Sequence, residues 1–439
     1  MNVAVVTLNR GRGSGVVARH QVRALIARGH DAYLVHSGEG SGELPVREVP
    51  LSFEVLPVHE YLPSEHDRQQ PVSAMDAEMA EWYIGDFDAA LRSLDPAPDL
   101  IVAHHANVTA VTARHAAGHL GIPYVLFVHG TGIEPRYHGG YADETWAQIE
   151  AAIQSAQSII VTTEYVRDEL VRPLVDVPFD RFRIAPGGVD LDAYRPGTGD
   201  AVRRRYDLPE TFVISPGALT EAKGPQNVVA AADLYTDLAL TIFLGDGDLR
   251  PTLEAKLGGR GRFLGYVPEE DKEALISAAT LLVAAPEKLE HFGMVYVEAL
   301  AAGTVPVAYE GGGVGSIVVP EVGLLTDRTP GSLGTAIRSL LEEPARTAEM
   351  ARAGRLRAEA HFDEDRLGNK FVDWIGALHD GTDRGRGSQR AGGSRAIWRL
   401  GRERRDHPRS GQRPGRAVPS YGHLRGGRRP VWRGRCLVA

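Results

Sequence analysis

Two glutamates, Glu290 and Glu298, stand eight positions apart in residues 290–303, EHFGMVYVEALAAG. The run after Gly293 is helix-like, and a glycine at a helix start lets a ligand approach the backbone closely. Glu298 would lie roughly 9 Å along the helix axis from Phe292, at ~1.5 Å per residue. Carboxylates accept paired hydrogen bonds from vicinal hydroxyls, so this spacing predicts one acid for each of two sugar rings in an elongated ligand. Two unrelated surface acids are the alternative.

Two glycine loops could hold an anion. Residues 11–15 follow an apolar run and precede a helix-like segment, where free backbone N–H groups favour phosphate. A dinucleotide-binding fingerprint needs a third glycine and an acid after the second strand, but the chain has Val16 and Ser37 there, which argues against NAD. Lys223 precedes Gly224 and a second helix-like segment, so its flexible side chain can reach a diphosphate. Plain turns and a solvated lysine are the alternatives.

Strand-like and helix-like segments alternate along the chain. Apolar runs that alternate with helices are typical of parallel sheets covered on both faces, which predicts an α/β fold of two tandem Rossmann-like domains. We expect a ligand in the cleft between them, at the carboxyl ends of the strands. In the first helix, Ser14 is the expected N-cap and Gly29 follows the end. The expected strands are residues 3–8, 32–36, 100–104, 124–130, 158–163, 212–218, 240–248, 262–267, 280–286 and 305–309.

Composition adds domain boundaries. Pro and Gly in residues 183–199 predict a linker. We therefore expect two Rossmann-like domains, over 1–196 and 197–360, a closing helix over 361–380 and a disordered tail over 381–439. The tail holds 16 arginines, no lysine and three acids, a balance of +13, whereas the whole chain has a net charge of −8. Its composition fits a functionless tail or a reading-frame artefact better than binding to nucleic acid or membrane.

The remaining composition excludes several classes of protein. Cys436 is the single cysteine, so a disulfide framework and a cysteine-based metal site are excluded. No apolar run approaches the ~20 residues of a membrane helix, and the first residues do not read as a signal peptide. We expect a cytoplasmic protein, with peripheral contact at the inner membrane face as an option and no nucleic acid partner.

Several motifs together resemble the retaining glycosyltransferases of glycosyltransferase family four, which have the GT-B fold. The resemblance covers residues 1 to about 375. Its most specific element is the E-x-F-G-x-x-x-x-E pattern at 290–298, followed by ALAAG and VPVA. The supporting segments occur in the expected order: PYVLFVHG, PGGVDLDAYRP, LTEAKG, FLGDGDLR and FLGYVPEED.

The resemblance implies a hexosyltransferase that needs neither metal nor cofactor and takes a UDP- or GDP-linked sugar as donor. The acceptor would be a hydroxyl group of a glycan, a lipid-linked or a small molecule. By this likeness, Glu298 would hold the ribose and Glu290 the transferred sugar. The backbone N–H groups of Phe292, Gly293 and Met294 would meet sugar hydroxyls and phosphate.

The remaining donor contacts also come from the resemblance. Lys223 would bind the diphosphate, helped across the cleft by Gly15, and the backbone at Tyr266 and Val267 would meet the base. His129 matches a first-domain histidine near the donor sugar; a strand-end histidine with only structural contacts is the alternative. Two more strand-end histidines, His104 and His105, could face the acceptor.

Three departures from the family pattern leave alternatives open. Ala218 stands where the family places an arginine, a second cation for the leaving diphosphate. Ser316 follows the glycine-rich turn in place of a common acid, and Gly187 replaces a common asparagine. A catalytically weak sugar-nucleotide-binding module is therefore one alternative. A sugar-nucleotide epimerase on the same fold is another, and a scaffold that uses its tail on anionic surfaces is a third.

Overall fold

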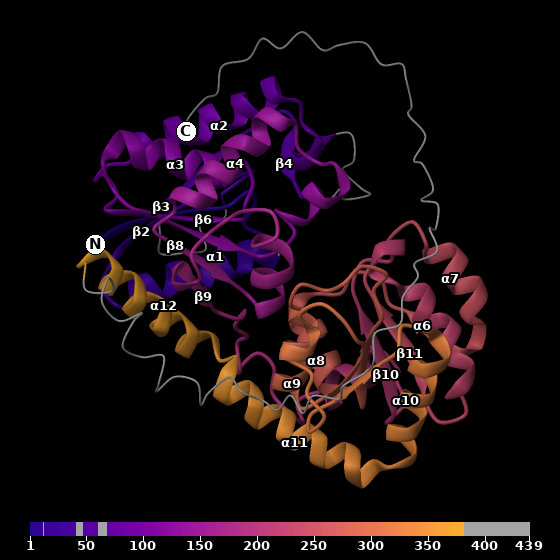
Figure 1. Ribbon diagram of the computed structural model, residues 1–439. Helices are drawn as coiled ribbons and strands as arrows, with labels where there is room; N and C mark the ends of the chain where they lie inside the picture. Colours follow the sequence, from indigo (N-terminus) through magenta and orange to yellow (C-terminus); the bar gives the residue numbers. More distant parts are fainter. Residues whose placement is uncertain (12, 41–46, 60–67, 382–439) are drawn as a thin grey trace, which may run out of the picture.

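The computed structural model describes residues 1–11, 13–40, 47–59 and 68–381. The predicted tail lies outside these residues, except for its first residue, Gly381. In the described part of the chain, no helix combines the length and the apolar character needed to cross a membrane. Two separate parallel sheets, each with helices on both faces, dominate the architecture (Figure 1). The predicted α/β fold with two parallel sheets is therefore confirmed.

The N-terminal domain, as named here, is a seven-stranded sheet with its helices. The strand order is β3-β2-β1-β6-β7-β8-β9, and every pair is parallel. The strands are β1 (Asn2–Val6), β2 (Asp31–Ser37), β3 (Arg47–Leu51), β6 (Leu100–His104), β7 (Tyr124–Val128), β8 (Ser158–Val161) and β9 (Phe182–Ile184). The helices are α1 (Gly13–Ala27), α2 (Ala77–Arg92), α3 (Val108–Leu120) and α4 (Asp143–Ser155). A small parallel pair stands apart from the main sheet, β4 (Leu56–Val58) with β5 (Gln69–Pro71).

The C-terminal domain, as named here, is a six-stranded sheet with its helices. Its strand order is β12-β11-β10-β13-β14-β15, again all parallel. The strands are β10 (Phe212–Pro216), β11 (Leu240–Leu244), β12 (Gly261–Phe263), β13 (Leu281–Ala284), β14 (Val305–Tyr309) and β15 (Leu324–Thr326). The helices on this sheet are α5 (Asp200–Arg205), α6 (Pro225–Ala231), α7 (Arg250–Leu257), α8 (Glu269–Ala278), α9 (Met294–Ala302), α10 (Pro330–Glu342) and α11 (Pro344–His361).

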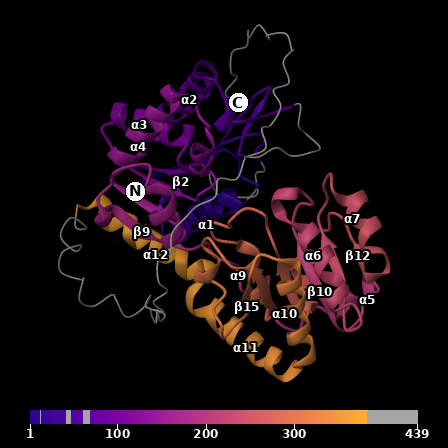
Figure 2. The same ribbon diagram turned by 45° about the vertical axis from the view of Figure 1, so that its right-hand side comes forward.

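The last helix, α12 (Glu364–His379), returns to the N-terminal domain. Figures 1 and 2 show α11 and α12 running in succession from one domain to the other. Phe371, Val372 and Ile375 of α12 share a buried core with strand β1 and helix α1. Arg28, just after α1, forms an ion pair with Asp373 at 2.7 Å. Because α12 covers one face of the N-terminal sheet, the end of the described chain completes a core that begins with the first strand.

Some local predictions were wrong at the ends of elements. Helix α1 begins at Gly13, so Ser14 lies inside the first turn and is not the N-cap. The linker predicted to begin at residue 183 starts later, because Arg183 belongs to β9, which pairs with β8. Most other strands end two to four residues before the predicted point, where glycine and proline turns begin. Strands β3, β4, β5, β9 and β15 were not predicted, because each is too short to show a clear apolar run.

Candidate active site

A cleft of about 580 Å³ lies between the two domains. The lining residues lie at the carboxyl ends of parallel strands, in the loops and helices that follow them, or in and beside the small pair β4–β5. The carboxyl edges of both sheets therefore face the same space. The N-terminal domain contributes Asn9, Gly11, Gly13, Ser14, Val17, Ser37, Leu56, Pro57, Val58, His59, Gln69, His105, His129, Thr131 and Thr162. The segments beyond it contribute Gly187, Lys223, Glu290, His291, Phe292, Gly293, Met294 and Val295.

The structure brings six of the predicted site residues to this cleft. They are Lys223, His129, Glu290, Phe292, Gly293 and Met294. Three others are not part of its lining. Gly15 lies buried in α1, where an added Cβ would collide with the backbone of Asn9. Val267 packs half-buried against the C-terminal core, and Glu298 is discussed below.

The segment before α9 forms an open helix N-terminus. Gly293 is the N-cap, with φ 100°, and no side chain caps the helix. A side chain at this position is excluded because its Cβ would lie 2.5 Å from the ring of Tyr296 and would require a left-handed backbone. The first N–H groups of α9 therefore have no side-chain acceptor, which suits an anion or sugar hydroxyls.

A glycine turn, residues 311–313, contacts the backbone of the segment that carries Glu290, and this contact was not predicted. The N–H group of Gly313 donates to the carbonyl oxygen of Glu290 at 2.7 Å. Added Cβ atoms at Gly312 and Gly313 would collide with the carbonyl oxygens of Glu290 and His291. Three successive glycines after a buried strand were the available signal, because they mark a close approach between backbones.

Lys223 reaches the cleft from a short turn after β10. The side chain is exposed, and the next residue, Gly224, presses against the backbone of Ala285, where an added Cβ would collide with the carbonyl oxygen. The pair Lys223-Gly224 thus fixes the turn beside the strand that leads to Glu290. Ala218 is exposed after the same strand, β10.

A chain of hydrogen bonds fixes the state of His129. The amide oxygen of Gln21 can only accept, so His104 donates to it from Nε2 at 3.0 Å. His104 then accepts at Nδ1 from Nε2 of His129 at 2.9 Å. This leaves Nδ1 as the acceptor nitrogen of His129. Burial lowers the pKa of His104 to about 3, and burial, with the nearby histidines, lowers the pKa of His129 well below its usual range. Both rings are therefore neutral near pH 7.

His105 lies in the cleft wall with a strained backbone. It has φ 78°, which is rare for a residue other than glycine, and only 1% of its surface is exposed. Nε2 of His105 is buried without a hydrogen-bond partner among the described residues. The ring of His59 lies 3.7 Å away, centroid to centroid. Of the two adjacent histidines considered for the acceptor, the structure thus places His105 in the wall and His104 behind it.

Glu298 is partly buried within the C-terminal domain. Its Oε1 atom lies 3.2 Å from Nζ of Lys272 in helix α8. Burial raises the pKa of Glu298, while Lys272 and the hydroxyl of Tyr194 oppose that shift. The geometry places this carboxylate in an ion pair outside the lining of the cleft, in contrast with the expected convergence of both acids on one space.

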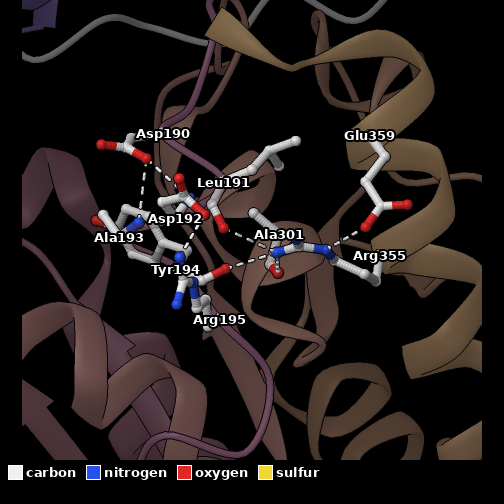
Figure 3. A network of polar contacts seen from close by, with 9 residues as sticks. All are labelled: Asp190, Leu191, Asp192, Ala193, Tyr194, Arg195, Ala301, Arg355 and Glu359. Atoms are coloured by element: carbon white, nitrogen blue, oxygen red, sulfur yellow. Dashed lines mark hydrogen bonds and ion pairs between the residues drawn. The ribbon is translucent and has the colours of Figure 1, made fainter.

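Tyr194 belongs to the segment that connects the domains, and an arginine holds that segment in place. Figure 3 shows Arg355 of α11 donating from Nη1 to the carbonyl oxygens of Leu191 (3.2 Å), Tyr194 (2.7 Å) and Ala301 (2.7 Å). Its Nε atom pairs with Glu359 at 2.7 Å. Because one charged donor is shared among three carbonyl oxygens, it fixes the connecting segment against α9, the helix that carries Glu298.

The buried histidines predict a loss of stability in acid. Burial lowers the pKa to about 3 for His104 and to about 4 for His59, against an ordinary value of 6.5. Below about pH 6.5 the unfolded chain binds more protons, so the free energy of unfolding falls as the pH falls. Denaturant titrations at about pH 7.5 and about pH 5 should show this, and His104→Gln should reduce the slope by about 1.4 kcal/mol per pH unit. An unchanged slope in that variant would contradict the neutral assignment of His104.

Two parallel sheets that face one cleft with the carboxyl ends of their strands define the GT-B architecture of glycosyltransferases. Solved structures agree. Sucrose-phosphate synthase from Thermosynechococcus elongatus has a TM-score of 0.68 at 19% identity, covering 87% of this chain and 100% of that chain. Anabaena HepE in complex with UDP and glucose has a TM-score of 0.67 at 18% identity, covering 86% and 100%. These similarities confirm the predicted GT-B fold.

Sequence comparison identifies the family. The family described as Glycosyltransferase Family 4 matches residues 11–193, and the one described as Glycosyl transferases group 1 matches residues 202–357. D-inositol 3-phosphate glycosyltransferase 1 of Catenulispora acidiphila is 32% identical over 308 residues, 64% of this chain and 72% of that protein. Alpha-maltose-1-phosphate synthase of Mycolicibacterium smegmatis is 28% identical over 338 residues, 66% and 86%. The chain belongs to glycosyltransferase family four, and it is a glycosyltransferase of the type that uses a nucleotide sugar.

Proposed function

We propose that this protein transfers a hexose from a UDP- or GDP-linked donor to a hydroxyl acceptor, with retention of anomeric configuration and without a metal ion. The observation that carries the proposal is the meeting of Lys223, Glu290 and the open N-terminus of α9 at one interdomain cleft. A solved relative in fold, Anabaena HepE, is described in complex with UDP-glucose, which supports a nucleoside-diphosphate sugar. We assign the protein to the cytoplasm, where such donors are made.

Charge drives the proposed mechanism. The donor leaves as a nucleoside diphosphate, and the ammonium group of Lys223 with the N–H groups at Gly293 and Met294 stabilises the developing anion. The acceptor hydroxyl enters on the face from which the phosphate departs, and a phosphate oxygen takes its proton. Glu290 orients the sugar hydroxyls, and Nδ1 of His129 accepts a hydrogen bond from one of them. No protein nucleophile is required.

The nucleoside is proposed to lie along α9 and α8. Glu298 holds the ribose hydroxyls after reorganisation of its pair with Lys272, and the backbone at Val267 meets the base. Gly15 allows the first glycine loop to approach the diphosphate from the opposite domain. The names of the curated relatives, an inositol phosphate glycosyltransferase and a maltose phosphate synthase, favour a small polar acceptor. Glycan and lipid-linked acceptors, the latter with contact at the inner membrane face, remain within the proposal.

A nucleotide screen tests the donor assignment. UDP or GDP should raise the melting temperature of the wild-type protein, and Glu298→Gln should abolish that shift because the ribose loses its carboxylate. Glu269→Gln is the matched control, since Glu269 pairs with the same lysine at 2.8 Å but is exposed. A screen in which no nucleoside diphosphate stabilises the protein would contradict the proposal.

A catalytically weak binding module is the second candidate, and Ala218 favours it. The family arginine missing at this position would be a second cation on the diphosphate, and one preorganised hydrogen-bond donor is typically worth about 2.7–4 kcal/mol in the transition state. Donor hydrolysis and transfer assays with glycan and lipid extracts separate the two candidates. Nucleotide binding without turnover of any donor would favour the binding module.

A further inference from the structure

His291, the residue between Glu290 and Phe292, projects from the C-terminal domain into the N-terminal domain. Its residue surface is 8% exposed. The ring lies directly on Gly130, after strand β7, where an added Cβ would collide with Cγ of His291. It also stacks on Tyr165 beyond strand β8, with 6.5 Å between ring centroids and 18° between ring planes. The side chain of His291, next to Glu290 in the sequence, thus packs between residues of the N-terminal domain.

Polar contacts fix the same residue across the domain boundary. The hydroxyl of Thr163 accepts from the N–H group of Val166 at 3.2 Å, so its own proton is available to donate to the carbonyl oxygen of His291 at 3.0 Å. Nε2 of His291 lies 3.5 Å from Oε2 of Glu134, which follows strand β7, without forming a hydrogen bond among the described residues. The side chain and the backbone of His291 are therefore both held by the N-terminal domain.

Gly313 of the C-terminal domain packs against the same backbone. An added Cβ at Gly313 would collide with the carbonyl oxygen of His291 and lie 2.9 Å from Cγ2 of Thr163. The N–H group of Gly313 also holds the carbonyl oxygen of Glu290. Because Glu290 is the residue next to His291, any movement of one domain against the other at this point displaces the backbone that carries the Glu290 carboxylate.

We propose that His291, Thr163 and Glu134 form an interdomain clamp that sets the spacing at which Glu290 and the donor face the N-terminal wall of the cleft. His291 is then a positioning residue. Its catalytic consequence depends on the proposed transferase function, whereas its effect on domain spacing does not. The clamp acts on alignment between the domains, so it contributes to kcat and leaves donor binding, which lies mainly in the C-terminal domain, nearly unchanged.

Kinetics and a distance measurement test the clamp in the full-length chain. His291→Ala should lower kcat for transfer by roughly 10–100-fold, with the donor Kd changed by less than about threefold. His291→Gln, which keeps a polar side chain near Glu134 and against Gly130, should recover part of kcat. Cys436 is replaced by serine, and cysteines for spin labels are introduced at two exposed positions, Glu144 and Asp248, one in each domain. The distribution of distances between the two labels should then be broader in His291→Ala than in the wild-type protein.

Two further variants keep the test decisive. Thr163→Val preserves shape and removes one hydroxyl, so it should broaden the distribution even if His291→Ala folds poorly. His20→Ala is the matched control: His20 pairs with Glu364 at 3.0 Å between α1 and α12, away from the cleft, and its loss should change neither measurement. An unchanged distribution in both clamp variants would overturn the proposal, as would an equal loss of donor affinity and kcat. A broadened distribution in the clamp variants of a protein without any transfer activity would uphold the clamp and count against the proposed function alone.

Discussion

Lys223→Ala is expected to lower kcat for sugar transfer by roughly 10²–10³-fold, the loss typical of removing one preorganised hydrogen-bond donor that stabilises charge in a transition state. The leaving diphosphate gains negative charge as the glycosidic bond breaks. Ala218 stands where the family has an arginine, so that cation is missing from the site. Lys223 is the lysine in the described lining of the cleft, so its removal leaves the helix N-terminus to stabilise most of that charge. Steady-state kinetics with the donor identified by the nucleotide screen measure the effect.

A matched lysine controls for nonspecific loss of charge. Lys256 is exposed in the last turn of α7 and does not line the cleft, so Lys256→Ala should leave kcat within about twofold of wild type. The assignment fails if both variants retain wild-type kcat, because another group would then carry the leaving-group charge.

Glu290→Gln is expected to have the second largest effect, a decrease in kcat of about 10²-fold with a smaller change in nucleotide affinity. The glutamine keeps the size of the side chain and the contacts of the backbone with Gly313, but it replaces one carboxylate oxygen by an N–H donor. Sugar hydroxyls then lose an acceptor that orients them for transfer. Isothermal titration with the nucleoside diphosphate separates this loss from a loss of binding.

Glu310→Gln is the control for this prediction. Glu310 is exposed at the end of β14, near the glycine turn that supports Glu290, and it is not part of the cleft lining. Equal kcat values for Glu290→Gln and Glu310→Gln would remove Glu290 from the proposed site.

The elements of the fold were largely predictable because they depend on local patterns. Strands such as Leu100–His104 and Val305–Tyr309 are nearly continuous apolar runs, which are typical of a parallel sheet covered on both faces. Their ends were less predictable, as the early start of α1 at Gly13 and the strand at Arg183 show. Termini are set by hydrogen bonds to distant segments, and those bonds are not written in the local sequence.

The family, the two parallel sheets and the order of the loops that reach the cleft were predictable from the residues alone, since topology carries Lys223 and Glu290 to the carboxyl ends of neighbouring strands. The contacts of the individual side chains became known only from the folded chain. The folded chain pairs Glu298 with Lys272, joins His104 to Gln21 and His129, and seats His291 against Gly130 and Thr163. Each of these contacts joins residues at least 25 positions apart, so it follows from packing between elements, which no local period encodes.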